Sequence, residues 1–185
     1  MHIGTEDNFL DLKVKEAVFN PQVLQAYLRE QNYGNKQPMT MASVDYFDHS
    51  TVVTELTQGE KPQYYSQFSF LNKMDSFFVE NILQNKLKIQ FYLDTNKPNK
   101  EIGHCEIFLA DLHNQERLGS VNSAVVEREY QIFPAEWLEP IMQKTRMKSL
   151  GTLRIKMRMR KPIRDVVRNY QNRSGINKAI SANQV

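Results

Sequence analysis

The chain has 185 residues and a mass of 21.7 kDa, which fits one domain of ordinary size with end segments. It holds one cysteine and no run of about 18 apolar residues, so an internal disulfide and a membrane-spanning segment are excluded, and a reducing compartment is expected. The net charge of +3 combines −8 over residues 1–143 (12 Lys/Arg, 20 Asp/Glu) with +11 over residues 144–185, where 12 Lys/Arg accompany one acid, Asp165.

Residues 1–38 are predicted to form an N-terminal arm with one short helix. Residues 1–19 alternate weakly and are expected to be a docking arm or an amphipathic turn. They lack the apolar core of a signal peptide, so a cytoplasmic location is expected. Asn20 followed by Pro21 is typical of a helix start, and Gly34 is a stop signal. The helix is expected over Pro21–Asn32, with one apolar stripe made of Val23, Leu24, Tyr27 and Leu28.

Residues 39–162 are predicted to form one domain of short strands, because the hydrophobic period changes at Met39 from helical to extended. Turn signals separate eight extended segments, at residues 39–47, 51–57, 64–70, 87–93, 102–108, 117–122, 126–133 and 150–162. Residues 74–83 suit a helical turn or an irregular crossing, residues 109–114 a short helix, and residues 134–148 a helical insertion. Gly103 is expected at a bulge or a close approach. This pattern predicts an antiparallel β-sandwich.

The last of these segments, Leu150–Pro162, alternates strictly between apolar and cationic side chains. One face is predicted to hold Leu153, Ile155, Met157 and Met159. The other face is predicted to hold Arg154, Lys156, Arg158 and Arg160. A strand with one buried and one solvated face has this pattern, whereas a helix would mix the two classes around its circumference.

Residues 163–185 are predicted to form a basic helix and tail. An apolar set recurs at helical spacing after Pro162, namely Ile163, Val166, Val167 and Tyr170. A short amphipathic helix is therefore expected over Ile163–Asn172, and the polar remainder is expected to stay extended unless it is bound.

Several of these segments resemble a known family. They are Asp45–Leu56 (DYFDHSTVVTEL), Gln63–Phe70 (QYYSQFSF), Phe77–Leu93, Glu101–Leu112 and Leu150–Ile163. Over residues 41–162 the strand pattern is similar to the C2 domains of the retinitis pigmentosa GTPase regulator-interacting protein family. The resemblance implies an all-β fold, a C2-like antiparallel eight-stranded β-sandwich, and a scaffold of the cilium or basal body.

The resemblance also indicates where a calcium site would lie. In calcium-binding members the second strand follows an Asp-Pro-Tyr motif, where this chain has Lys61-Pro62-Gln63-Tyr64, and the other ligand loop has an Asp-x-Asp motif, where it has a single carboxylate, Asp94. Asp45 and Asp48, on or near the first strand, could add ligands. Because Ca²⁺ takes six to eight oxygen ligands, these loops hold too few carboxylates, and no metal is expected. His104 and Glu106 suggest zinc only superficially, because no second cysteine is present.

No catalytic residue or cofactor site is expected, and the chain is predicted not to be an enzyme. Cys105 lies in a predicted strand, where a packed side chain is favoured over a nucleophile. Function is instead expected from a basic face and tail. The residues predicted to bind a partner are Arg154, Lys156, Arg158, Arg160, Lys161, Arg164, Arg168 and Arg173. A competing interpretation is that acids of neighbouring strands, such as Glu127 and Glu129, neutralise this row.

The expected function is that of a calcium-independent structural or adaptor protein of the cilium (axoneme, basal body or transition zone). It would bind ciliary or axonemal proteins, with the acidic surface of tubulin as one candidate. The alternative is a calcium-independent phospholipid-binding C2 membrane adaptor, whose cations meet anionic headgroups. A basic tail without a specific partner also fits the charge. Nucleic acid is disfavoured because the aromatic residues are not interleaved with the cations.

Overall fold

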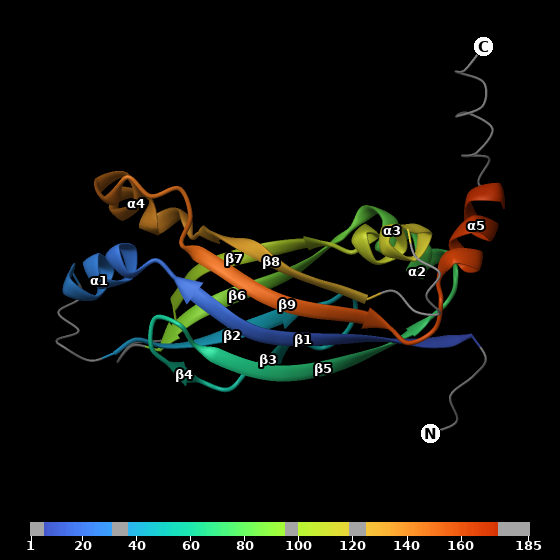
Figure 1. The fold of residues 1–185 in the computed structure, drawn as a ribbon, viewed down its shortest axis with the longest axis horizontal. Helices are drawn as coiled ribbons and strands as arrows, with labels where there is room; N and C mark the ends of the chain where they lie inside the picture. Colours follow the sequence, from blue (N-terminus) through green and yellow to red (C-terminus); the bar gives the residue numbers. More distant parts are fainter. Residues whose placement is uncertain (1–5, 31–36, 95–99, 119–124, 174–185) are drawn as a thin grey trace, which may run out of the picture.

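The computed structural model describes residues 6–30, 37–94, 100–118 and 125–173 (Figure 1). The strands are β1 (Asp7–Phe19), β2 (Met39–Asp45), β3 (Val52–Val53), β4 (Thr57–Gln58), β5 (Gln63–Lys73), β6 (Lys86–Asp94), β7 (Lys100–Phe108), β8 (Val125–Pro134) and β9 (Gly151–Met159). The helices are α1 (Pro21–Glu30), α2 (Ser76–Gln84), α3 (Ala110–Leu118), the 3-10 turn η1 (Glu136–Leu138), α4 (Glu139–Thr145) and α5 (Arg164–Arg173).

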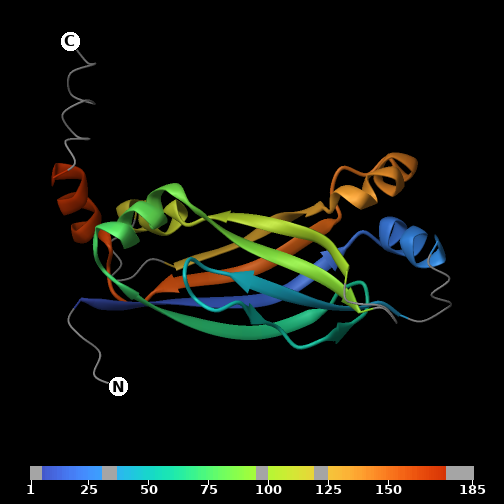
Figure 2. The same ribbon diagram turned by 180° about the vertical axis from the view of Figure 1, so that it is seen from behind.

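The strands pair antiparallel in the order β3-β2-β6-β7-β8-β9-β1-β5, and β4 pairs with β2. β7 and β8 share only the pairs Gly103–Pro134 and His104–Phe133, at one end of β8. The sheet therefore folds over at this junction into two layers, β5-β1-β9-β8 and β3-β2-β6-β7 (Figures 1 and 2). The predicted antiparallel β-sandwich is confirmed, with nine strands among the described residues in place of the eight predicted.

The core lies between the two layers and is built by strict alternation along the long strands. In β1 the side chains of Leu10, Leu12 and Val14 are fully buried. Across the core, the ring of Phe19 in β1 meets the ring of Phe91 in β6 edge to face, with centroids 5.5 Å apart. Such aromatic contacts add to the burial of apolar surface that holds the layers together.

Gly103 is confirmed both as part of a bulge and as a point of close approach. Phe91 pairs with Gly103 and Tyr92 with Glu101, so the intervening residue, Ile102, is the extra residue of a bulge. A Cβ atom on Gly103 would lie 2.4 Å from the carbonyl oxygen of Phe133 in β8. The absence of a side chain here lets β7 and β8 meet where the sheet folds over.

The prediction that residues 1–38 form an arm outside the sandwich is wrong for residues 7–19. β1 pairs with β9 on one side and with β5 on the other, so it lies inside one layer. The physical reason is that burial alternates without a break from Asn8 to Val14, and apolar and charged residues alternate strictly from Leu10 to Val14. The sandwich therefore begins with β1, and the boundary predicted at residue 39 does not separate a domain from an arm.

The predicted helices are largely confirmed. Asn20 caps α1, because its side-chain oxygen accepts hydrogen bonds from the backbone N–H groups of Gln22 and Val23 at 3.0 and 3.4 Å. Two of the eight predicted strands differ from the structure. Residues 51–57 hold only β3 and the start of β4. The predicted strand at 117–122 begins within α3, and its residues 119–122 lie outside the described residues.

Candidate protein-interaction surface

The outer face of β9 carries the cations predicted from its alternation. Leu153, Ile155 and Met157 are fully buried, and Met159 continues this inner row. Arg154 and Arg158 are exposed, and Lys156 is half-buried, on the opposite face. β9 lies between β1 and β8, so this row runs along the middle of a layer and not along its edge.

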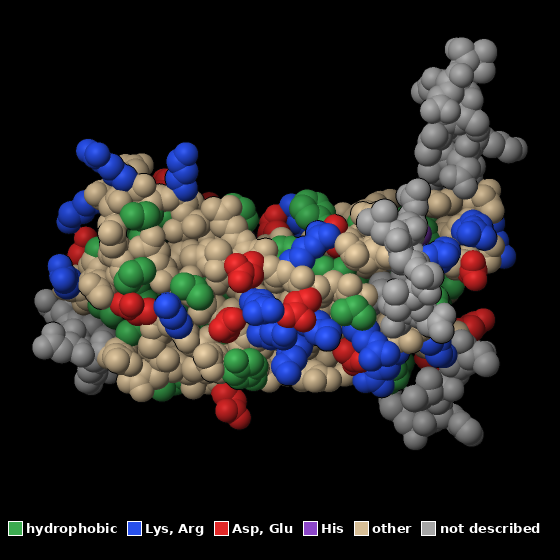
Figure 3. Space-filling model, in the orientation of Figure 1, with side chains coloured by type: hydrophobic (Ala, Val, Ile, Leu, Met, Phe, Trp, Pro, Cys, Tyr) green, Lys and Arg blue, Asp and Glu red, His purple; other side chains and the backbone are tan. Residues whose placement is uncertain are grey.

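Acidic side chains of the neighbouring strands interleave with this row. Arg154 lies opposite Glu16 of β1 and Glu129 of β8, and Lys156 lies opposite Glu127 of β8. Arg154 bonds Glu127 at 2.9 Å and lies 3.8 Å from Glu16. Figure 3 shows Lys/Arg and Asp/Glu side chains side by side over the middle of this face. The competing interpretation from the sequence therefore holds for Arg154, although Glu127, and not Glu129, is its bonded partner.

Lys15 of β1 also belongs to this network. Its ammonium group bonds the Glu127 carboxylate at 2.6 Å. The hydrogen bond from Lys15, assisted by Arg154, lowers the pKa of Glu127 below the usual value for glutamate. Acids and cations therefore lie side by side on the outer face of this layer, which favours a partner with a matching charge pattern over any polyanion.

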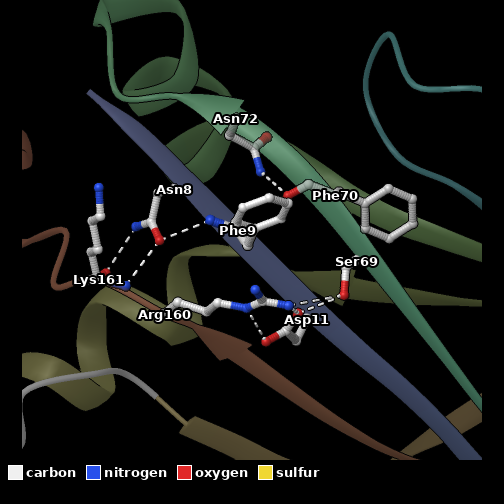
Figure 4. Close-up of polar contacts among 8 residues, drawn as sticks. All are labelled: Asn8, Phe9, Asp11, Ser69, Phe70, Asn72, Arg160 and Lys161. Carbon is white, nitrogen blue, oxygen red and sulfur yellow. Dashed lines mark hydrogen bonds and ion pairs between the residues drawn. The ribbon is translucent and has the colours of Figure 1, made fainter. Parts of the chain in front are cut away.

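Arg160 has a structural role that the sequence did not reveal (Figure 4). Its guanidinium group makes two hydrogen bonds to the Asp11 carboxylate, at 2.7 and 2.8 Å, and a longer one to the hydroxyl of Ser69 at 3.3 Å. It also lies over the ring of Phe9, 4.5 Å from the centroid. A bidentate pair of this kind joins β9, β1 and β5 and holds Arg160 in place.

Next to Arg160, the buried side chain of Asn8 fastens the chain where it leaves β9. It accepts a hydrogen bond from the backbone N–H of Lys161 and donates one to the Lys161 carbonyl, both at 2.9 Å (Figure 4). Both main-chain groups of Lys161 are thereby satisfied at the exit from the sheet. The chain is thereby held against β1 three residues before α5 begins.

We expect replacement of Arg160 by methionine to reduce the free energy of unfolding at pH 7, because it removes the bidentate pair with Asp11; the partial exposure of the pair keeps this loss small. The hydrogen bond from Arg160 lowers the pKa of Asp11. The stability that this pair adds is present above the unfolded-state pKa of about 4 and is lost as the pH falls through the lowered folded-state value. Urea unfolding at several pH values should show the difference between the two proteins shrinking below about pH 4. A difference that stays constant with pH would contradict this role.

α5 packs against the end of the sandwich through a narrow apolar stripe. Ile163 and Val167 are fully buried, and the Tyr170 hydroxyl bonds the Glu80 carboxylate of α2 at 2.9 Å. Arg168 and Arg173 are exposed. The guanidinium group of Arg168 lies 3.8 Å from the carboxylate of Asp165, three residues earlier in α5, which is a long distance for an ion pair. An exposed pair at this distance contributes little, so these cations are available to a partner.

The structure brings the eight predicted residues into one path. Arg154 to Arg160 follow the outer face of β9, Lys161 leads out of the sheet, and Arg164, Arg168 and Arg173 lie on α5 at the end of the molecule (Figure 1). The remaining cations of the basic quarter divide differently. Of the four others, Lys144, Arg146 and Lys148 lie in or just after α4, at the opposite end (Figure 1), and Lys178 lies outside the described residues. The charge of +11 over residues 144–185 is therefore not one basic face.

Sequence reasoning missed the β1 members of this surface, Asp11, Lys13, Lys15 and Glu16. Their alternation with buried Leu10, Leu12 and Val14 was the available signal. Only the pairing of β1 with β9 shows that these side chains share a face with the predicted cations.

Chemistry at the remaining candidate positions is limited. The His104 ring lies 3.8 Å from Glu101, while Glu106 bonds Lys86. Among the described residues, no group of three His, Cys, Asp or Glu side chains could hold a metal ion. Residues 95–99, which complete the second calcium-loop position, lie outside the described residues.

In the described part of the chain, no helix has the length and apolar character needed to cross a membrane.

Cys105 is fully buried in β7, and burial raises the pKa of its thiol to about 12. We expect the native protein not to react with a thiol reagent such as iodoacetamide at about pH 8, because almost no thiolate is present and the sulfur is inaccessible. Alkylation followed by mass spectrometry, in buffer and in urea, measures this. Rapid modification in buffer would show that the strand is not packed as described.

Comparison with known proteins identifies the fold family. The model of the family described as the first C2 domain of RPGR-interacting protein 1 matches residues 1–162. The match includes β1, which the resemblance seen in the sequence alone did not, and it ends before α5.

Solved structures agree with this fold. The chain is similar to a structure of CC2D1B, with a TM-score of 0.58 and 16% identity, covering 88% of this chain and 60% of that one. It is also similar to a structure of the two tandem C2 domains of Extended-Synaptotagmin 2, with a TM-score of 0.52 and 13% identity, covering 85% of this chain and 40% of that one. At these identities the likeness shows the fold alone. The chain spans less than two thirds of either solved chain.

Proposed function

The chain belongs to the family of the first C2 domain of RPGR-interacting protein 1, and on this basis we propose that it is a non-catalytic, calcium-independent adaptor of the cilium. It works in the cytoplasm on ciliary structures, at the axoneme, basal body or transition zone, and it binds protein partners. The acidic surface of the microtubule is the first partner to test. C2 domains of this family are generally non-catalytic.

The observation that carries this proposal is the path of cations from β9 onto α5. Along β9 the side chain of Arg154 is paired with Glu127 and Glu16, which suits selective recognition. On α5 the side chain of Arg168 is 64% exposed, and Arg173 is also exposed. The Asn8 contact to Lys161 and the buried Ile163 and Val167 hold α5 on the body before any partner arrives. A preorganised surface loses less entropy on binding than a free tail does.

Co-sedimentation of the full chain with microtubules tests the proposal. Binding is expected at about 50 mM salt and should weaken strongly by about 150 mM, because exposed charges are screened. The variant with Arg164, Arg168 and Arg173 all replaced by glutamine should bind roughly tenfold more weakly, since it removes three cations from the contact.

A matched control removes the same charge from the other end of the molecule, by replacing Lys144, Arg146 and Lys148 with glutamine. This variant should bind like the natural sequence. Equal losses in the two variants would mean non-specific attraction, and no binding at low salt would remove the microtubule from the proposal. Flotation with phosphoinositide-containing liposomes, with and without calcium, distinguishes the membrane-adaptor alternative.

A further inference from the structure

A hollow of about 450 Å³ opens at the end of the molecule where β1 begins. It lies between the β2–β3 loop, the end of β5 and the start of α2, and its walls include Phe47, His49, Leu71 and Phe77. No residue of β9 lines the hollow, so it is separate from the row of cations described above.

The walls of this hollow are fixed in the unbound protein. Tyr46, which is 1% exposed, donates a hydrogen bond from its hydroxyl to the side-chain oxygen of Asn72 in β5 at 2.9 Å. The rings of Phe47 and His49 both stack on the ring of Tyr46, with centroid distances of 4.2 and 5.4 Å. The β2–β3 loop is thus held against β5, which makes the hollow a preformed site and not a gap closed by side-chain movement.

Phe77 gives the hollow an unfilled aromatic rim. It lies in the first turn of α2 and is 60% exposed, whereas its neighbour Phe78 is buried in the core. An exposed aromatic ring beside a concave site is the usual anchor of a protein interface, because covering it removes a large apolar area from water. The ring face also attracts cations.

The charge of the lining decides which partner fits. Three carboxylates, those of Asp7, Asp48 and Asp75, line the hollow together with one cation, Lys73. Asp75 also caps α2 by accepting a 2.9 Å hydrogen bond from the N–H of Phe78, which holds its carboxylate at this position. A basic group entering the hollow gains from this field, and an acidic group is repelled.

We propose that this hollow binds a short segment of a partner protein in which an apolar side chain stands next to an arginine or lysine. The apolar side chain covers Phe77 and Phe47, and the cation meets the carboxylates of Asp48 and Asp75. The chemistry is opposite to that of α5, which offers cations to an acidic partner. The two surfaces therefore suit partners of opposite charge, and this site does not depend on the ciliary role proposed above.

The test is a titration of the isotope-labelled full chain, followed by amide NMR shifts. The probes are a hexapeptide of alternating leucine and arginine and its counterpart of alternating leucine and glutamate. The leucine–arginine peptide is expected to produce saturable shifts at residues 47–49 and 75–78, and the leucine–glutamate peptide should produce none.

Three variants locate the contact. Phe77→Ser should weaken binding of the leucine–arginine peptide at least about tenfold, as expected for a central aromatic anchor. Asp48→Asn should weaken it about threefold and make it less sensitive to salt. Phe133→Ser is the matched control. Phe133 is also exposed, at 44%, but it lies where β8 pairs with β7 and does not line the hollow, so the change should leave binding unchanged.

Equal binding of both peptides would overturn the proposal, as would shifts that map elsewhere or a Phe77→Ser variant that binds normally. Shifts at residues 47–49 and 75–78 that change with protein concentration alone would assign the hollow to a second copy of the chain. That result would also overturn the proposal.

Discussion

A chain that lacks residues 1–19 is expected not to fold. Deletion removes β1 from the middle of a layer, so β9 and β5 each lose the strand that joins them. It also removes the fully buried side chains of Leu10, Leu12 and Val14 from the core. Circular dichroism and one-dimensional NMR should show no cooperative urea transition and little dispersion of methyl signals. A truncated chain that unfolded cooperatively would revive the interpretation of these residues as an arm.

Single substitutions in β1 give the same test in a folded protein. Leu12→Ala leaves a cavity in the core and should cost about 3 kcal/mol of unfolding free energy. The adjacent Lys13 faces outward, so Lys13→Ala should change stability by less than about 0.5 kcal/mol. Equal effects at the two positions would show that the alternation along β1 does not distinguish core from surface.

Gly151→Ala is expected to be among the most damaging single changes in the chain. A Cβ atom at this position would lie 2.1 Å from the carbonyl oxygen of Val18 and 2.9 Å from the Cα of Phe19. Both are main-chain atoms of β1, so relief requires the two strands to separate at the start of β9. We expect a loss of at least about 3 kcal/mol in urea unfolding, or failure to fold.

Gly59 is the matched control for this substitution. It has a left-handed φ of 103°, but a Cβ atom there would meet nothing closer than 3.9 Å. Gly59→Ala should therefore cost only about 1 kcal/mol, from backbone strain without a steric clash. If Gly151→Ala cost no more than Gly59→Ala, the tight contact between β1 and β9 would be contradicted.

The outer face of β9 shows how a strand pattern can mislead about charge. Periodicity correctly separates Leu153 and Ile155 from Arg154 and Lys156, because it depends only on the geometry of one strand. It says nothing about what lies beside them. Glu127 and Asp11 come from β8 and β1, and they neutralise Arg154 and Arg160 across the sheet. Asp11 and Arg160 are 149 residues apart in the chain, so no local pattern pairs them.

The same distinction applies to the two ends of the molecule. The excess of cations after residue 143 is visible in the composition, but its division between α4 and α5 follows from the direction of β9, which carries the chain from one end of the sandwich to the other. The hollow beside Phe77 had no signal in the sequence, because its walls come from a loop, a strand end and a helix start.

Local patterns in the sequence were enough to predict the antiparallel sandwich, the short helices, the closing strand and the helix that follows it. These depend on periodicity, turn residues and helix caps, which act over a few neighbouring residues. The folded chain was needed to show that β1 belongs to the sheet, which cations remain exposed and where the hollow lies. Those properties depend on strand pairing between distant segments, and burial and charge compensation are settled only when the pairs have formed.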